Sequence, residues 1–229
     1  TIGSNVQTIP SYAFYRCMNI SGQLVIPNSV TTIGNSAFSV CSGFSGELVI
    51  PNSVISIGYS AFSNCSGFSG DLIIPNSVTN IGSSAFLYCT GFTGVLQIGS
   101  SMTSIESETF SSCSGFSSII IPDSITEIGS FAFYGCSSLS SFNIPNSVEA
   151  IKWAVFNNTG WYNNQPDGVL YLDGWCLGFK GDPSEFESII IQEGTLHISD
   201  AAFTNCRGLT SVVLPNSLVY ISEMAFEDS

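Results

Sequence analysis

Hydrophobic and polar positions recur along this chain with a fixed period of about two dozen residues. The unit is most complete in residues 41–64, CSGFSGELVIPNSVISIGYSAFSN. Its cysteine returns in steps of 24, 24, 24, 24 and 23 residues, at Cys17, Cys41, Cys65, Cys89, Cys113 and Cys136. The phenylalanine of its Ala-Phe pair keeps the same step, at Phe14, Phe38, Phe62, Phe86, Phe110, Phe133 and Phe156, and after an interruption at Phe203 and Phe226. A fixed period of roughly 20 to 50 residues indicates a solenoid, in which each coil buries its apolar face against its neighbours.

Three elements are predicted within each unit. Residues 48–51 alternate and are β-branched, which predicts a short strand that ends at proline and continues into an Asn-Ser turn. Val54 and Ile57 mark a second extended segment with both side chains inward. Residues 61–65, Ala-Phe-x-x-Cys, suit one helical or 3₁₀ turn, because residues three apart share a face.

Stacked units would place matching side chains in continuous columns of Phe, Cys and Ile, about 4.8 Å apart. The first segment of each unit then predicts one parallel sheet. Its eight strands end at Pro27, Pro51, Pro75, Gly99, Pro122, Pro145, Gln192 and Pro215. Because the opposite, helical side is bulkier, we expect the sheet to lie on the concave face. A right-handed parallel β-helix is the alternative architecture, since its coils can have a similar length.

The repeated phrase closely resembles the BspA-like leucine-rich repeat family. It reads LVIPNSVTTIGNSAFSVC over residues 24–41 and LIIPNSVTNIGSSAFLYC over residues 72–89. The resemblance covers nearly the whole chain and implies an α/β solenoid. This would be a curved, right-handed stack of turns of 23 to 24 residues, with a parallel β-sheet on the concave face and short helical or 3₁₀ turns on the other side. It also implies a bacterial surface or secreted protein, extracellular in location, that binds host or partner proteins without catalysis. The family offers no fixed binding residues to transfer.

Composition narrows the classes of partner. The 229 residues are 44% hydrophobic and only 9% charged, which favours a folded chain. A formal charge of −13 repels phosphate backbones, so nucleic acid is not expected as a partner. No apolar run approaches the roughly 18 to 20 residues needed to cross a bilayer. Residues 1–229 are interpreted as one solenoid domain cut from a longer protein, with an irregular, aromatic-rich insert at about 157–188.

The eight cysteines are expected to be buried free thiols, not a disulfide framework. Six of them occupy the same position in successive coils, and parallel Cβ vectors do not readily form a disulfide torsion. His197 is the single histidine and has no cysteine at zinc-finger spacing, so it is interpreted as a rim residue of a degenerate coil.

Acidic side chains offer no predicted metal or catalytic centre either. The pairs Glu106/Glu108 and Glu185/Glu187 are interpreted as solvated loop acids. Asp182, Glu185 and Glu187 lack the D-x-D-x-D-G pattern of a calcium loop. We therefore expect neither a cofactor nor an enzymatic activity.

Surface recognition is the remaining class of function, and the strand pattern predicts a stripe of residues that would carry it. The outward positions of the eight predicted strands are Val25, Val49, Ile73, Gln97, Ile120, Asn143, Ile190 and Val213, of which six are apolar. Polar residues flank them, Glu47 and Asp71 among these. An exposed apolar stripe with a polar rim is typical of a protein-binding surface. The alternative is that β-branched residues stand there only because they suit a strand.

The insert supplies a second hypothesis. Trp161, Tyr162, Tyr171 and Trp175 gather near an Asp173-Gly174 hairpin signal. Their rings could bind a carbohydrate or a peptide, or could simply pack the hairpin onto the solenoid. A third hypothesis is that the chain is a structural spacer in a longer surface protein.

Overall fold

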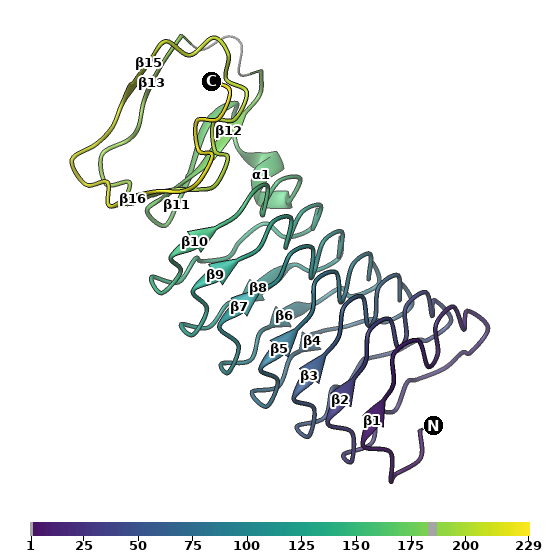
Figure 1. Ribbon diagram of the computed structural model, residues 1–229. Helices are drawn as coiled ribbons and strands as arrows, with labels where there is room; N and C mark the ends of the chain where they lie inside the picture. The colour runs from purple at the N-terminus through teal and green to yellow at the C-terminus, as the bar shows by residue number, and fades with distance from the viewer. Residues whose placement is uncertain (1, 183–186) are drawn as a thin grey trace.

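The Ile positions of successive units are held together as parallel β-ladders in the computed structural model, which describes residues 2–182 and 187–229 (Figure 1). Ile33 lies opposite Ile57, and Ile57 opposite Ile81, so each residue pairs with the residue one repeat unit further along the chain. The first ladder contains β1 (Thr8–Ile9), β2 (Thr32–Ile33), β3 (Ser56–Ile57) and β5 (Asn80–Ile81). A second contains β7 (Ser104–Ile105), β9 (Glu127–Ile128) and β10 (Ala150–Ile151). The predicted solenoid and its isoleucine column are confirmed.

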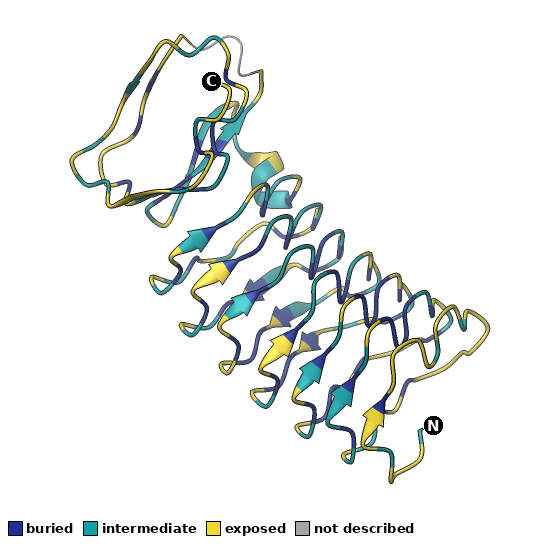
Figure 2. Cartoon of the chain, viewed as in Figure 1, coloured by how far each residue is buried: buried dark blue, intermediate teal, exposed yellow. Residues whose placement is uncertain are grey.

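Phenylalanine rings form the predicted column inside the coils. Neighbouring rings from Phe14 to Phe156 are nearly parallel, with centroids 5.1 to 5.8 Å apart. A second column, which was not predicted from the sequence, runs beside it through Phe44, Phe68, Phe92 and Phe116. In Figure 2 the buried residues, coloured dark blue, recur at matching places in successive coils of the middle of the stack. Stacking of like on like is therefore what fills the core.

The predicted sheet of eight strands is formed only in part. One group holds β4 (Leu72–Ile73), β6 (Val95–Gln97) and β8 (Ser118–Ile120), and another pairs β13 (Ser188–Ile190) with β15 (Ser211–Val213). Within the described residues, the segments that end at Pro27, Pro51 and Pro145 have no strand pairing over their Leu-x-Ile or Phe-x-Ile residues. The single continuous sheet was therefore a wrong expectation.

The Ala-Phe-x-x-Cys segment differs from the single helical or 3₁₀ turn predicted for it. Three chained β-turns replace that turn, closed by the amides of Ala61, Ser63 and Cys65, each donating to the carbonyl three residues earlier. The intervening amides donate instead to the next coil, as from Phe62 to the Ala85 oxygen (2.8 Å). A helical turn would direct every amide along its own chain, so bonding between coils decides the conformation.

Left-handed backbone conformations accompany these turns. Ser60 has φ of 51° and Asn64 has φ of 60°, and corresponding residues of the other coils have similar values. Such residues reverse the peptide direction at the third position of a turn, which allows alternate amides to point along the solenoid axis. The cost is a conformation that side-chain-bearing residues rarely adopt.

A hairpin interrupts the stack after the seventh Ala-Phe-type pair. The short helix α1 (Gly160–Asn164) is capped by Thr159, whose hydroxyl accepts from the Tyr162 amide (3.1 Å), and it ends before Pro166. β11 (Gly168–Leu172) and β12 (Trp175–Lys180) follow, antiparallel, joined by Asp173 and Gly174 with positive φ. This is the predicted Asp-Gly hairpin.

β12 then takes the place of a coil in the ladder. Cys176 lies opposite Ile198 of β14 (His197–Ile198), and β14 pairs with β16 (Tyr220–Ile221). The core divides at this strand, because Trp175 packs with the residues that precede the hairpin and Cys176 with those that follow it. In Figure 1 the last coils, coloured yellow, are turned relative to the earlier ones. Across the described residues, no helix is long and apolar enough to cross a bilayer.

Candidate binding surfaces

All eight residues of the predicted stripe are exposed, and we call this set the LxI stripe. Its apolar members expose about half or more of their side chains, as Val49 (58%), Ile73 (54%) and Ile190 (74%) show. Their immediate neighbours are buried: Leu48 exposes 3% and Ile50 6%. Strict alternation between adjacent residues therefore places apolar side chains in water beside a closed core. The predicted exposure is confirmed, whereas binding by the stripe is not tested by it.

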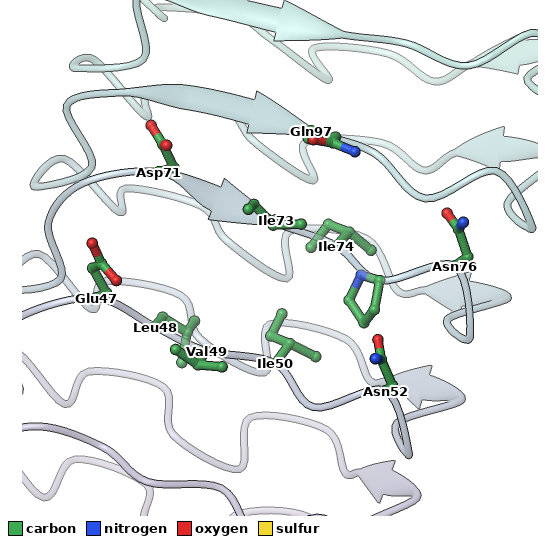
Figure 3. Close-up of a pocket in the computed structure, with 11 residues that line it drawn as sticks. Glu47, Leu48, Val49, Ile50, Asn52, Asp71, Ile73, Ile74, Asn76 and Gln97 are labelled. Atoms are coloured by element: carbon green, nitrogen blue, oxygen red, sulfur yellow. The ribbon is translucent and has the colours of Figure 1, made fainter.

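A hollow of about 390 Å³ opens on this face between two neighbouring coils (Figure 3). We call it the slot. One wall is the segment 47–50, and the other is the segment 71–76. Asn52 and Gln97 complete its lining. Glu47 and Asp71 were predicted only as residues that flank the stripe, and the hollow between them was not predicted.

The slot exists because the coils are not hydrogen-bonded there. Within the described part of the chain, the amides and carbonyls of Leu48, Val49 and Ile50 make no backbone hydrogen bond. β4, on the opposite wall, pairs only with β6 on its far side. Unpaired backbone groups require water or a partner, and the edge of a sheet is a template for binding.

Carboxylates stand at one end of the slot. Asp71 is fixed by the Val95 amide, which donates to its Oδ1 (2.7 Å). Glu47 projects from the opposite wall, with its Cγ 3.3 Å from where a Cβ on Gly70 would lie. Both acids are exposed. The slot thus combines negative charge, unpaired backbone groups and two exposed aliphatic side chains.

The four aromatic residues of the insert do not form one surface. Trp175 is 2% exposed and stacks on His197, with ring centroids 4.5 Å apart, so it is not available to a ligand. Trp161 packs edge-to-face on Phe142 (5.9 Å). The Tyr171 hydroxyl accepts from the Gln192 amide (3.1 Å). These contacts attach the insert, α1 and the hairpin together, to both neighbouring parts of the solenoid.

Tyr162, in α1, contacts different residues from Tyr171. The Lys180 ammonium group lies 5.4 Å from the centre of the Tyr162 ring. Burial, with a contribution from the charge of Asp167, raises the pKa of the Tyr162 phenol. Tyr171 and Tyr162 line separate hollows, so the predicted aromatic ligand patch is dispersed.

The cysteines of the regular coils form a hydrogen-bonded column of free thiols. Thiols from Cys41 to Cys136 donate to Phe carbonyls of earlier coils, as Cys65 does to Phe38 and Cys89 to Phe62, both at 3.0 Å. Burial raises the pKa of the Cys89 thiol to about 12. All eight cysteines are free thiols here, and seven of them are buried, whereas Cys17 is half-buried. Burial and high pKa suppress the thiolate, so the column residues are packing groups and not nucleophiles.

Candidate catalytic and metal groups are dispersed. No set of three His, Cys, Asp or Glu side chains that could hold a metal occurs in residues 2–182 and 187–229. The Glu108 carboxylate accepts from the Ser84 hydroxyl, and Glu106 from Ser104. His197 is half-buried, and burial lowers its pKa. Glu185, from the acids considered for calcium, lies outside the described residues.

Repeat period, parallel ladders and columns of like side chains together define a leucine-rich repeat solenoid. The family model described as the BspA type leucine-rich repeat region matches residues 7–96, 68–164 and 178–229. The chain belongs to this family.

Solved structures support the same assignment. A leucine-rich repeat protein from Bacteroides ovatus superposes with a TM-score of 0.69 at 28% identity, over 99% of this chain and 63% of that one. A leucine-rich cell surface protein from Faecalibacterium prausnitzii gives a TM-score of 0.65 at 25% identity, over 95% of this chain and 68% of that one. The chain thus spans about two thirds of these proteins. A search of curated protein sequences gives no match.

Proposed function

We propose that the chain is a non-catalytic binding module of a bacterial cell-surface or secreted protein and recognises a partner protein through its LxI stripe. The exposure of the six apolar members of the stripe carries this proposal. Val25, Val49, Ile73 and Ile120 project at successive or nearly successive coils, with Gln97 between the last two. A row of side chains at the coil spacing offers apolar contacts along an extended surface.

Protein is favoured over other partner classes by the chemistry of this face. Apolar side chains in water, bordered by Glu47, Asp71 and several serines, combine a hydrophobic centre with a polar rim. The acidic chain repels nucleic acid. The similar protein from Faecalibacterium prausnitzii is a cell surface protein, which supports the proposed location.

The test is a selection from a phage-displayed library of random peptides on the immobilised wild-type protein, after which the selected peptides are titrated against two variants. In the stripe variant, Val49→Ser, Ile73→Ser and Ile120→Ser remove the apolar row. In the control, Ile20→Ser, Ile55→Ser and Val219→Ser remove similarly exposed apolar groups that lie outside it.

We expect peptides selected on the wild-type protein to bind the control and to lose at least tenfold in affinity for the stripe variant. Circular dichroism melts check that both variants fold. Peptides that bind the folded stripe variant as well as the wild type would reject the stripe as the binding surface.

A further inference from the structure

We propose that the slot between residues 47–50 and 71–76 receives an arginine side chain of the partner protein. This inference rests on the proposed function, and it assigns a chemical class to the group that enters the stripe at one defined position. Three properties of the slot support it independently: its charge, its free hydrogen-bonding groups and its aliphatic walls.

The charge of the slot is negative and uncompensated by its lining. Glu47 and Asp71 both line it: Glu47 points from the segment 47–50 toward the segment 71–76, and Asp71 points from that segment toward the coil of β6 (Figure 3). The four basic residues of the chain, Arg16, Lys152, Lys180 and Arg207, do not line it. With 17 acids in the whole chain, the surrounding field has the same sign. A cation from outside therefore complements the slot.

Hydrogen-bond acceptors are available in more than one direction. The Val95 amide occupies Asp71 Oδ1 and so orients the carboxylate, while Oδ2 has no partner among the described residues. The carbonyls of segment 48–50 are likewise free of backbone hydrogen bonds within the described chain. A guanidinium group carries five N–H donors in a planar fork, whereas an ammonium group is a compact point charge. Because the acceptors are distributed over two walls of the slot, they favour the guanidinium group of arginine over the ammonium group of lysine.

The walls also suit the stem of the side chain. Val49 and Ile73 stand at the mouth of the slot and expose 58% and 54% of their surface. The methylene groups of arginine can cover such aliphatic surface while the charged head lies deeper or at the polar end. The same two residues belong to the LxI stripe, so an arginine in the slot would extend contacts already made by the stripe.

Comparison with the coils on the other side of β4 explains why the slot opens here. Among the described residues, segment 24–26 is unpaired as well, so the slot is distinguished by its lining, which includes both Glu47 and Asp71. Between β4 and β6 the backbone groups bond to each other, as Ile74 does to the Gln97 oxygen (2.9 Å). β6 and β8 are paired in the same way. Where neighbouring strands are paired in this way, their backbone carbonyls are already hydrogen-bonded and do not face a ligand as free acceptors.

The probe is the pentapeptide Thr-Val-Arg-Val-Thr with blocked ends, titrated into ¹⁵N-labelled protein and followed by NMR. Parallel titrations use peptides in which citrulline or lysine replaces arginine. Citrulline keeps the planar shape and loses the charge. We expect the arginine peptide to shift the amides of residues 48–50 and 71–73, the citrulline peptide to bind about tenfold more weakly, and the lysine peptide to fall between them.

Two charge-matched variants complete the test. Glu47→Gln with Asp71→Asn removes both charges and keeps an oxygen for the Val95 amide. Glu127→Gln with Glu149→Gln removes two exposed charges outside the slot. We expect about tenfold weaker binding of the arginine peptide only in the first variant.

Equal binding of the arginine and citrulline peptides, equal binding by the two variants, or no shift at the slot at millimolar peptide would overturn the arginine assignment. The phage selection separates this failure from that of the proposed function. If selected peptides lose affinity for the stripe variant but not for the Glu47→Gln, Asp71→Asn variant, the stripe stands and the arginine assignment fails. If they keep affinity for both, the two proposals fail together.

Discussion

The regular stack up to Phe156 and the part that follows it are built from the same repeat but are held together differently. In the regular stack, each Phe ring stacks on the corresponding ring of the next coil, and the buried Cys thiols donate to Phe carbonyls of earlier coils. After the hairpin, the Phe column is represented by Phe203 and Phe226, and a separate core begins at Cys176. Repeated coils stack through the same contacts at every step, whereas the two parts on either side of the hairpin are joined by contacts found only there.

Those bridging contacts come from the insert itself. Trp175 packs on the earlier core and stacks on His197 of the later part. Tyr171 ties β11 to Gln192. Trp175 and Tyr171, two of the four rings predicted as a ligand patch, thus join two lengths of solenoid.

The largest expected difference between the two regions concerns the Phe column. Phe62 is fully buried with rings on both sides, each at 5.3 Å, whereas Phe226 is half-buried with one ring at 5.1 Å. Phe62→Ala should lower the free energy of unfolding by about 3–5 kcal/mol, because it leaves a cavity. Phe226→Ala should cost about 1–2 kcal/mol. Urea unfolding followed by circular dichroism measures both, and equal losses would contradict a column that strengthens toward the middle of the stack.

Close approach of coils predicts a smaller effect. A Cβ on Gly67 would lie 2.0 Å from the Phe44 oxygen and 2.7 Å from the Ser42 oxygen, so Gly67→Ala forces two coils apart, at about 1–3 kcal/mol. Gly194, after the hairpin, has open space but φ of 92°, so Gly194→Ala should cost about 1 kcal/mol from backbone strain alone. The same urea titration compares them. A Gly67→Ala variant as stable as wild type would show that the coils do not touch there.

The two regions meet at the contact between Trp175 and His197, which we call the junction. Mild acid should lower the stability of the protein through this junction. Burial lowers the pKa of His197 beneath its ordinary value of 6.5, so the unfolded chain binds a proton more readily than the folded one. Stability is therefore full above pH 6.5 and falls as the pH drops from there toward the folded-state pKa. Since His197 is the sole histidine, the His197→Phe variant, which keeps a ring on Trp175, should lack this part of the decline.

Thermal melts of both proteins between about pH 7.5 and pH 5.5 make the comparison. Asp200, whose pKa is raised by burial, shifts stability the other way, and because both proteins carry it, its effect cancels in the comparison. Parallel melting curves for wild type and His197→Phe across this window would contradict the burial of a neutral imidazole at the junction.

The architecture could be predicted because the period fixes which residues lie over one another. Once the coils stack in register, matching rings must lie over one another, as those of Phe38, Phe62 and Phe86 do. The chained turns could not be predicted in the same way. Residues such as Val40, with φ of 60°, do not signal a left-handed conformation, and they adopt it because their amides bond across coils.

The slot escaped prediction because the Leu-x-Ile segments look alike whether or not they pair. Residues 24–26 and 48–50 are both Leu-Val-Ile, and residues 72–74 are Leu-Ile-Ile. Gly22, Gly46 and Gly70 have positive φ and precede segments 24–26, 48–50 and 72–74, but segment 142–144, unpaired within the described chain, follows two serines, so no local residue separates paired from unpaired segments. The coil that leads into β8 is one residue shorter before its strand and has serines instead.

Hydrogen–deuterium exchange of the protein with and without a selected peptide tests the central claim most directly, because it compares the two regions in one experiment. The account predicts slower exchange on peptide binding in residues 47–50 and 71–74, with unchanged exchange in residues 160–180. Protection confined to the hairpin, with the Leu-x-Ile segments unaffected, would contradict it.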